Sequence, residues 1–254
     1  MSDRPQPEEL AGGEPLELSI VLPAHNEVML LGSTVTNLVT GLSERARTFE
    51  LIVAENGSSD GTLHLAELLA IQFEQVRVLH SPTGDYGGAL VRGFQAARAP
   101  IVVNFDVDYY DLAFLDAALE RLAAGSELVL ASKRAPGARD DRPILRRALT
   151  AGLAVLLRTV LGLRVSDTHG MKALRRAPLA SIVSACTMRE SMFDAEMVLR
   201  AERAGLSIAE IPARVLERRP PRTSLARRTL ESVVGIVVLW RRLRSEEPGP
   251  RPGG

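Results

Sequence analysis

The chain has 254 residues, of which 46% are hydrophobic and 24% are charged. This composition is typical of a globular protein with a sizeable core, and it excludes a disordered, collagen-like or coiled-coil chain. Lys plus Arg and Asp plus Glu number 31 each, so the formal net charge is zero and a uniformly basic nucleic-acid binder is excluded. The zero is a cancellation, because residues 1–132 carry 7 basic and 19 acidic side chains (net −12) and residues 133–254 carry 24 and 12 (net +12).

The single cysteine, Cys186, excludes an internal disulfide framework and is consistent with a reducing compartment. Residues 1–15 are acidic and proline-rich, lack the basic-then-apolar order of a signal peptide, and are predicted to be disordered. No apolar run approaches the roughly 20 residues of a membrane-spanning helix. We therefore expect no spanning segment, whereas contact with a membrane surface is compatible with the sequence.

Short apolar runs alternate with helical patterns from residue 16 to residue 132. The expected strands cover residues 18–23, 49–54, 76–79, 101–105 and 127–132. The expected helices between them cover residues 28–42, 61–73, 88–97 and 112–124. This alternation predicts an α/β fold in which helices flank both faces of a mostly parallel sheet.

Polar residues follow three of the expected strands, at the edge where open α/β sheets bind their ligands. The segments are Pro-Ala-His-Asn-Glu at 23–27, Glu-Asn-Gly-Ser-Ser-Asp-Gly at 55–61 and Asp-Val-Asp at 106–108. Turn and helix-capping chemistry explains any one of these loops equally well. Three of them on one predicted edge favour a binding site.

Asp106 and Asp108 are two carboxylates at the end of an expected strand. Close carboxylates repel unless a cation neutralises them, and Mg²⁺ or Mn²⁺ prefers oxygen ligands together with substrate phosphates. A divalent metal between this pair and a diphosphate is therefore one interpretation. The alternative is an acidic strand end with no ligand, because Asp-x-Asp is a weak signal on its own.

The strand–helix rhythm stops after residue 132, where the basic half begins. A basic segment is followed by an apolar helical pattern over residues 148–163, a helix near 194–204 and a strand at 208–211. An apolar run at 233–240 then precedes Arg241, Arg242 and Arg244. Basic amphipathic helices of this kind are typical of membrane interfaces. Packing of both helices on the protein's own core is the alternative.

Four segments resemble, in order and spacing, the family 2 glycosyltransferases of GT-A fold: residues 19–27, 55–62, 87–93 and 106–108. The length and the C-terminal half resemble the polyprenyl-phosphate sugar synthases, such as dolichol-phosphate mannose synthase and dolichol-phosphate glucosyltransferase. The resemblance extends from about residue 18 to residue 225. It implies a Rossmann-like GT-A domain over residues 16–225, then an amphipathic membrane-interface helix and a disordered tail over 226–254.

The resemblance also implies roles for individual residues. The donor nucleotide sugar would contact Pro23, Ala24, Glu27, Glu55, Asn56, Asp106, Val107 and Asp108. Asp106 and Asp108 would hold Mg²⁺ or Mn²⁺, and acceptor or phosphate contacts would come from Arg134, His169, Lys172 and Arg218. Asp108, Asp194 and Arg218 would be catalytic. As an isolated histidine, His169 is more often structural, and Asp194 is equally explained as a helix N-terminal acid.

Several positions depart from the family pattern. Glu55-Asn56 replaces Asp-Asp, Tyr110 stands where a metal-coordinating Gln is common, and Thr223-Ser224 replaces Ser-Lys. The usual lysine of the glycine-rich loop is absent, with Asp85 nearby. These changes weaken the prediction that the transferred sugar is mannose much more than the prediction of sugar transfer itself. They are also compatible with a variant enzyme or an inactive relative of the family.

The expected activity is that of an inverting, metal-dependent glycosyltransferase. It would move a hexose from a nucleotide sugar of the GDP-mannose or UDP-glucose type to a polyprenyl phosphate, with no nucleic-acid partner. The protein would be cytoplasmic and peripheral on the inner face of the cell membrane. A phosphate acceptor is already charged and needs positioning rather than a base. The first alternative, a soluble or glycan hydroxyl acceptor, needs a base such as Asp194. The second is a non-catalytic sugar-nucleotide-binding or membrane scaffold protein.

Overall fold

The computed structural model describes residues 15–140, 144–190, 192–215 and 225–246, and its main feature is a seven-stranded sheet in the order β3-β2-β1-β4-β7-β5-β8. All neighbouring strands are parallel except β7, which runs antiparallel to β4 and β5. The strands are β1 (Leu18–Ala24), β2 (Phe49–Asn56), β3 (Val76–Ser81), β4 (Ile101–Asn104), β5 (Leu128–Ser132), β7 (Lys172–Arg175) and β8 (Ile208–Pro212). The mostly parallel α/β fold expected from the sequence is confirmed.

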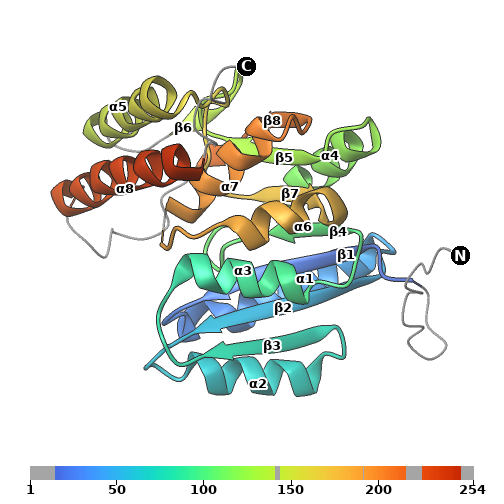
Figure 1. Ribbon diagram of the computed structural model, residues 1–254. Helices are drawn as coiled ribbons and strands as arrows, with labels where there is room; N and C mark the ends of the chain where they lie inside the picture. The colour runs from blue at the N-terminus through green and yellow to red at the C-terminus, as the bar shows by residue number, and fades with distance from the viewer. Residues whose placement is uncertain (1–14, 141–143, 191, 216–224, 247–254) are drawn as a thin grey trace, which may run out of the picture.

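Eight helices surround this sheet in the described part of the chain, and a separate two-stranded parallel ladder joins β6 to β9. The ladder pairs β6 (Arg139–Asp140) with β9 (Arg214–Val215). The helices are α1 (Val28–Glu44), α2 (Thr62–Gln72), α3 (Tyr86–Ala96), α4 (Leu112–Ala123), α5 (Ile144–Leu161), α6 (Arg176–Ala185), α7 (Met192–Arg203) and α8 (Leu225–Glu246). Figure 1 shows α5 and α8 side by side above the sheet, where they pack on each other.

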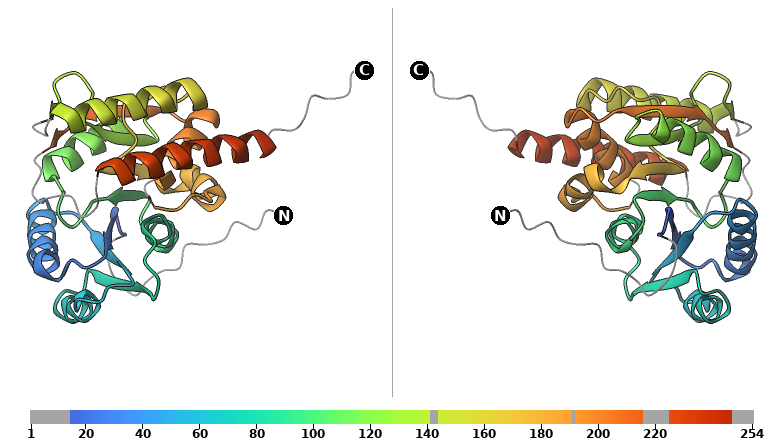
Figure 2. Two further views of the ribbon diagram at one scale, coloured as in Figure 1. Left: turned by 90° about the vertical axis from the view of Figure 1, so that its left-hand side faces the viewer. Right: turned by 90° about the vertical axis from the view of Figure 1, so that its right-hand side faces the viewer.

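Two hydrophobic clusters cover the two faces of the sheet. Ile20 and Leu22 of β1 pack with α1, α2 and α4, whereas Val21 between them packs with α3, α6, α7 and α8. Successive residues of a strand point to opposite faces, so a buried strand needs apolar residues at every position. The views in Figure 2 show α1 and α3 on opposite sides of the sheet.

Helix α8 packs only one of its faces onto the core. Ile236, Leu239 and Leu243 are buried in the same cluster as α3, α6 and α7, while Leu230 and Val234 are exposed. The sequence-based boundary at residue 225 coincides with the start of α8, and its treatment as a separate unit stays a prediction. Residues 1–14 and 247–254, where disorder is expected, lie outside the described residues. In the part of the chain that the structure describes, no helix is long and apolar enough to cross a membrane.

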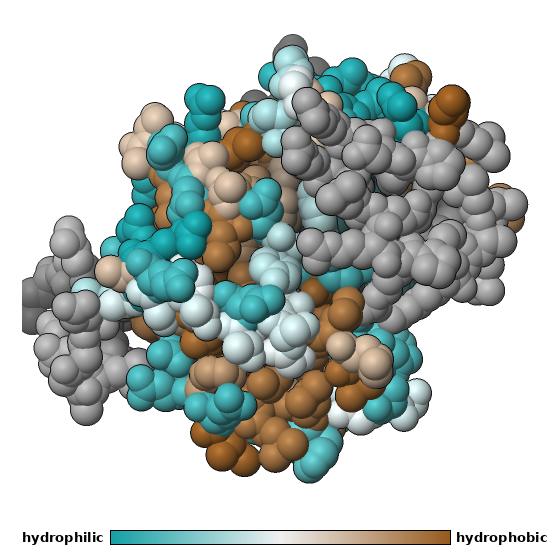
Figure 3. Space-filling view, turned by 180° about the vertical axis from the view of Figure 1, so that it is seen from behind, coloured by the Kyte–Doolittle hydropathy of each residue, from teal (hydrophilic) through white to brown (hydrophobic). Residues whose placement is uncertain are grey.

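Apolar side chains also reach the surface at the other end of the sheet. In Figure 3 they gather at the bottom of the molecule, where α2 lies. Leu68 and Ile71 of α2 are both exposed, the latter by 82%. This surface is distinct from the exposed apolar surface of α5 and α8. Substitutions on α2 can therefore serve as controls for substitutions on α8.

Candidate functional site

The candidate site lies where the carboxyl ends of β1 and β4 meet. The chain runs from β1 outward to β2 and β3, and then returns to β4 on the other side of β1. Asn104 is in register with Val21, and the Phe105 N–H donates to the Val21 carbonyl oxygen over 3.1 Å. Pro23 and Asp106 therefore emerge at one edge. A reversal of strand order of this kind is where open α/β sheets bind ligands.

The Asp-Val-Asp segment forms a tight turn directly after β4. The backbone N–H groups of Asp106 and Tyr109 donate to each other's carbonyl oxygens, both over 3.1 Å. The Val107 side chain is buried, and its carbonyl oxygen accepts a 2.7 Å hydrogen bond from the Thr34 hydroxyl of α1. Core packing on Val107 thus fixes the turn, while the flanking Asp106 and Asp108 stay half-buried.

Asp106 is in an environment that disfavours its charge. Its pKa is raised to about 6, chiefly by burial and also by the nearby carboxylates of Asp194 and Asp108. The charge of Lys172 and the hydroxyl of Tyr86, 3.4 Å from Asp106 Oδ1, act in the opposite direction. A cation at this turn would relieve the mutual repulsion of the carboxylates.

The turn supplies two carboxylates as possible metal ligands. No group of three or more His, Cys, Asp or Glu side chains suited to a metal occurs among the described residues. A hard divalent cation held by Asp106 and Asp108 would therefore complete its oxygen shell with water and substrate phosphate, which is common for Mg²⁺. Tyr110 offers no ligand in this arrangement, because its hydroxyl accepts a 3.0 Å hydrogen bond from Asn37 and so lies against α1.

The loops after β1 and β2 are bonded to each other. The Asn26 N–H donates to Ser58 Oγ over 3.0 Å, and the Ser59 N–H donates to Asn26 Oδ1 over 2.9 Å. The Glu27 N–H donates to Thr62 Oγ1 at the start of α2 over 2.8 Å. Asn26 has a positive φ of 55°, a conformation that asparagine tolerates better than most residues. The two loops therefore form one rigid wall beside the Asp106–Asp108 turn.

Glu55 and Asn56, both expected to contact the donor, hold the protein's own backbone. The buried Glu55 carboxylate accepts the Ser58 N–H over 2.7 Å and contacts His80 Nδ1 at 2.5 Å. Burial raises the pKa of Glu55, but the hydrogen bonds from Ser58 and His80 outweigh it and lower the pKa overall. Asn56 Oδ1 accepts the Asp85 N–H over 2.7 Å. Both side chains therefore support the loop after β2 rather than face open space. Pro23 and Ala24 form the end of the neighbouring strand β1, and Glu27 lies directly before α1.

Lys172 and Asp194 form an ion pair beneath the site. Lys172 Nζ lies 2.9 Å from Asp194 Oδ1 and donates to the Gly170 carbonyl oxygen over 2.8 Å. The two side chains are only 1% and 3% exposed. Asp194 was expected as a base and Lys172 as a phosphate contact, yet in this structure each neutralises the other. Both side chains act electrostatically on Asp106, so the pair is placed to support the Asp106–Asp108 turn.

His169, Arg134 and Arg218 were the remaining expected phosphate contacts. His169 lies in a loop held by Asp167, whose Oδ1 accepts the His169 N–H over 3.1 Å. Burial lowers the pKa of His169, so its imidazole is neutral at pH 7 and offers a hydrogen bond rather than a charge. Arg134 is exposed and donates to the Thr150 carbonyl oxygen of α5 over 3.5 Å. Arg218 lies outside the described residues.

Two residues at this edge had no sequence pattern to reveal them. Tyr86, at the first position of α3, reaches Asp106 with its hydroxyl. Burial and the neighbouring carboxylates of Asp106 and Asp194 raise its pKa well above the usual value, so the hydroxyl remains a donor. Arg189 precedes α7 and forms an ion pair with Asp85 over 2.6 Å. The glycine-rich segment 87–93 adjoins Tyr86 in the sequence, and the stretch before the expected acid Asp194 adjoins Arg189.

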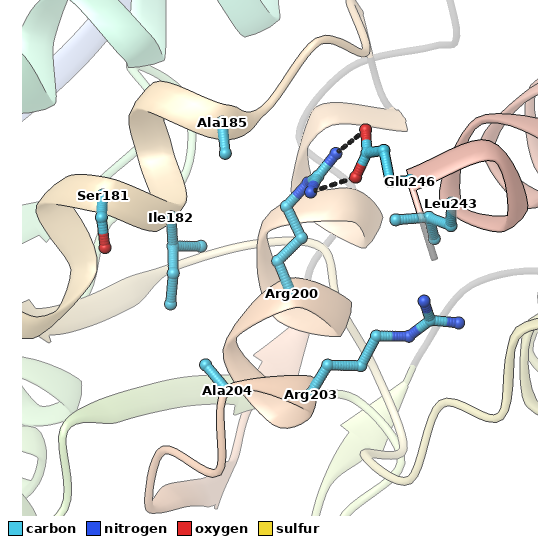
Figure 4. A pocket seen from close by; sticks show the side chains of 8 residues that line it. All are labelled: Ser181, Ile182, Ala185, Arg200, Arg203, Ala204, Leu243 and Glu246. Atoms are coloured by element: carbon cyan, nitrogen blue, oxygen red, sulfur yellow. Dashed lines mark hydrogen bonds and ion pairs between the residues drawn. The ribbon is translucent and has the colours of Figure 1, made fainter. Parts of the chain in front are cut away.

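A separate hollow of about 450 Å³ lies between α6, α7 and the end of α8. Figure 4 shows Arg200 reaching across it to Glu246, with Ile182 and Leu243 beside them. Both terminal nitrogens of Arg200 contact the Glu246 carboxylate, at 2.8 and 2.9 Å. This ion pair attaches the end of α8 to α7. The hollow contains none of the expected donor-site residues, and the edge at β1 and β4 remains the candidate site.

Comparison with known families identifies the chain. The family model described as glycosyl transferase family 2 matches residues 19–183, which include β1, β2 and the Asp106–Asp108 turn. The chain belongs to glycosyl transferase family 2. The family 2 protein is therefore a glycosyltransferase, as expected from its four motifs, and the non-catalytic alternative is set aside.

Curated relatives of this family 2 protein include enzymes named for polyprenyl-phosphate acceptors. The undecaprenyl-phosphate mannosyltransferase of Micrococcus luteus is 28% identical over 87% of this chain and 92% of its own length. The dolichyl-phosphate hexose transferase of Haloferax volcanii is 29% identical over 80% and 84%. Glycosyltransferase AglD of Haloferax volcanii is 35% identical over 78% of this chain, which spans about a third (32%) of the length of AglD. The family 2 protein resembles the polyprenyl-phosphate sugar synthase type.

Solved structures agree on the architecture. Glucosyl-3-phosphoglycerate synthase from Mycobacterium tuberculosis, in complex with Mn²⁺, UDP-glucose and phosphoglyceric acid, has a TM-score of 0.66 and 24% identity. That likeness covers 89% of this chain and 80% of the synthase chain. At this level of identity it shows the fold alone, which is of GT-A type.

Proposed function

We propose that the family 2 protein transfers a hexose from a nucleotide sugar to a polyprenyl phosphate with inversion at the anomeric carbon. The observation that carries the proposal is the rigid edge at β1 and β4, where Asp106 and Asp108 flank the buried Val107. The curated relatives named for undecaprenyl and dolichyl phosphate support this acceptor class. The nucleotide sugar is of the UDP-glucose or GDP-mannose type.

Asp106 and Asp108 fit a divalent cation, Mg²⁺ or Mn²⁺, through their oxygen chemistry and the raised pKa of Asp106. Structural neighbours were solved with Mn²⁺ and UDP, which supports this choice. Such a cation would stabilise negative charge on the departing diphosphate. The protein's part is positional: Val107 and Thr34 fix the turn, and Asn26 and Glu27 fix the opposite wall.

The Lys172–Asp194 pair favours a phosphate over a hydroxyl acceptor. A hydroxyl acceptor must lose its proton to a base, and Asp194 was the residue expected to take it. Asp194 is buried and paired with Lys172 at 2.9 Å, so it is enclosed by the protein rather than open to an acceptor hydroxyl. A phosphate monoester is already a charged nucleophile and requires only orientation and charge screening.

We also propose that α5 and α8 place the protein peripherally on the inner face of the cell membrane, with the enzyme in the cytoplasm. Val155 of α5 and Leu230, Val234 and Val237 of α8 are exposed by 44–66%. The side chains of Arg241 and Arg244 are exposed on the last turns of α8, with Arg244 4.2 Å above the Trp240 ring. Apolar, aromatic and basic residues on one surface are typical of interfacial helices.

The test is a transfer assay with the full chain, Mn²⁺ and radiolabelled UDP-glucose or GDP-mannose. One reaction contains a short-chain polyprenyl monophosphate and a parallel reaction contains the corresponding polyprenol. We expect labelled lipid with the monophosphate and none with the alcohol. Labelling of the polyprenol or of a soluble glycan, with none of the monophosphate, would contradict the proposal.

A further inference from the structure

The segment from Cys186 to Glu190, between α6 and α7, lies on the first turn of α3. A Cβ atom at Gly87 would be 2.9 Å from Phe193 Cβ and 3.3 Å from the Met188 carbonyl oxygen. Contact this close requires glycine at position 87. The segment, a motif-free part of the sequence, thereby reaches the edge that carries the donor-site loops.

The buried Glu196 fixes this segment in place. Its Oε2 accepts the N–H groups of Thr187 and Met188 over 2.8 and 2.6 Å, and its Oε1 accepts from Arg200 over 2.8 and 2.9 Å. Arg242 of α8 adds a 2.6 Å hydrogen bond to the Thr187 hydroxyl. Charge-assisted hydrogen bonds of this kind hold a backbone precisely. Arg189 is therefore presented from a rigid support.

Among the described residues, the guanidinium of Arg189 is held at the edge by its ion pair with Asp85. It lies 2.6 Å from Asp85 Oδ2, and its side chain is 69% exposed. Asp85 itself is fixed, because its N–H donates to Asn56 Oδ1 and its Oδ1 accepts the Gly88 N–H. An exposed ion pair contributes little stability, so a better anion can replace Asp85 at low cost.

Arg189 is connected to the carboxylates of the site through Asp85 and Tyr86. Its partner Asp85 is followed by Tyr86, whose hydroxyl lies 3.4 Å from Asp106 Oδ1. Lys172, by contrast, is buried in its pair with Asp194 and offers no exposed charge. Asp85 offers Arg189 only Oδ2, because its Oδ1 accepts the Gly88 N–H. Phosphate oxygens can instead pair with arginine in a bidentate geometry.

We propose that Arg189 is a substrate-binding residue that exchanges Asp85 for phosphate oxygens when substrate binds. The inference rests on the proposed function, and it adds a phosphate contact from the segment before α7. The phosphate is either the diphosphate of the donor or the monophosphate of the lipid acceptor. Asp85 serves as the resting partner that orients the guanidinium.

The test compares Arg189→Ala, Arg189→Lys and the unmodified full chain. Calorimetry gives the Kd of UDP and of GDP in the presence of Mn²⁺, and the transfer assay gives the KM of a short-chain polyprenyl monophosphate. We expect Arg189→Ala to raise one of these constants by about tenfold or more, as for a hydrogen bond to a charged group. Arg189→Lys, which keeps the charge but loses the bidentate geometry, recovers part of the loss.

Two control variants separate binding from structure. Arg45→Ala removes another exposed arginine–aspartate pair, with Asp116, and should change neither constant. Asp85→Asn keeps an acceptor for the Gly88 N–H but breaks the ion pair with Arg189. If Arg189 only held the loop through Asp85, Asp85→Asn would weaken binding as much as Arg189→Ala. The proposal expects Asp85→Asn to leave binding equal or tighter.

Each outcome has a defined meaning. A higher Kd for the nucleoside diphosphate assigns Arg189 to the donor, and a higher KM for the lipid with unchanged Kd assigns it to the acceptor. Unchanged constants in an Arg189→Ala protein that still transfers hexose overturn this inference alone. An unmodified protein that neither binds a nucleoside diphosphate nor transfers hexose overturns it together with the proposed function.

Discussion

At the edge where β1 and β4 end, which we propose binds the donor and call the donor edge, the loops after β1 and β2 bond to each other. On α5 and α8, by contrast, apolar side chains face outward. Asn26 joins the loops through Ser58 and Ser59, and Glu55 is buried behind them. On α8, Val234 and Val237 are exposed next to the arginines that follow Trp240. Hydrogen bonds between loops fix the geometry of the first region, which suits the small polar ligand that we propose for it. The second has the composition of a surface that contacts a larger apolar partner.

The neutral total charge is the sum of an acidic and a basic half of the chain. The acidic half contributes Asp106 and Asp108, which we propose hold a cation beside the donor diphosphate. The basic half contributes α5, α8 and Arg189, which suit phosphates and anionic lipids. The two halves meet at the edge where Asp85 and Arg189 form their ion pair, 104 residues apart in the chain.

The largest effect is expected from replacing Asp108, the proposed metal ligand. Asp108→Ala should lower kcat at least about a thousandfold, or ~4 kcal/mol in the barrier, because charge on the departing diphosphate loses its stabilisation. Steady-state transfer kinetics measure this. Asp116→Ala, which removes an exposed carboxylate paired with Arg45, is the matched control and should keep full activity. Full transfer by Asp108→Ala would rule out the metal role of this residue.

The second largest effect is expected from breaking the buried ion pair between Lys172 and Asp194. Lys172→Met should lower the free energy of unfolding by about 3 kcal/mol, because Asp194 is left buried without its partner. Urea unfolding measures this. The double variant Lys172→Met/Asp194→Asn should be more stable than the sum of the two single changes predicts. Additive losses would show that the two side chains are not coupled.

The buried Glu55 should make the stability of the protein depend on pH in the acid range. Its folded-state pKa is lowered, so its contribution to stability is present above its unfolded pKa and is lost as pH falls through the folded value. Glu55→Gln should cost about 2 kcal/mol at pH 7 and reduce the decline in stability below pH 4.5. Chemical unfolding at pH 3.5–7 tests this, and an unchanged acid decline would contradict it.

The smallest expected effect concerns the surface of α8. The double variant Val234→Asp/Val237→Asp should weaken binding to anionic vesicles about tenfold, because charge replaces apolar area at the interface. Co-sedimentation with phosphatidylglycerol-containing vesicles measures this. Ile71→Asp, on the exposed part of α2, is the matched control and should not change vesicle binding. Equal binding by all three proteins would count against a membrane role for α8.

The two regions also differ in how well the sequence predicts them. In the first half, apolar strands and helices alternate regularly, so β1 to β5 and the helices between them were predicted to within a few residues. The loops of the donor edge follow from the ends of those strands. In the second half, β7 is a four-residue strand, Lys-Ala-Leu-Arg, that runs directly into α6, and neither element was predicted.

The residues that sequence reasoning missed depend on tertiary contacts. Asp85 and Arg189 share no local pattern, and Tyr86 becomes notable only because α3 begins beside Asp106. Glu55 and Lys172 were expected to contact ligand because they match positions of the family motifs; in the structure both are buried and contact protein partners. Spacing along the chain indicates which residues are near a site, whereas packing decides which of them face it.

Calorimetric titration of UDP and GDP into the full chain, with and without Mn²⁺, tests the donor edge most directly. The account predicts that one of these nucleotides binds in the presence of Mn²⁺ and binds at least about tenfold more weakly without it. Asp108→Ala should remove the difference between the two conditions. Equal binding with and without Mn²⁺, or no binding of either nucleotide, would contradict the account.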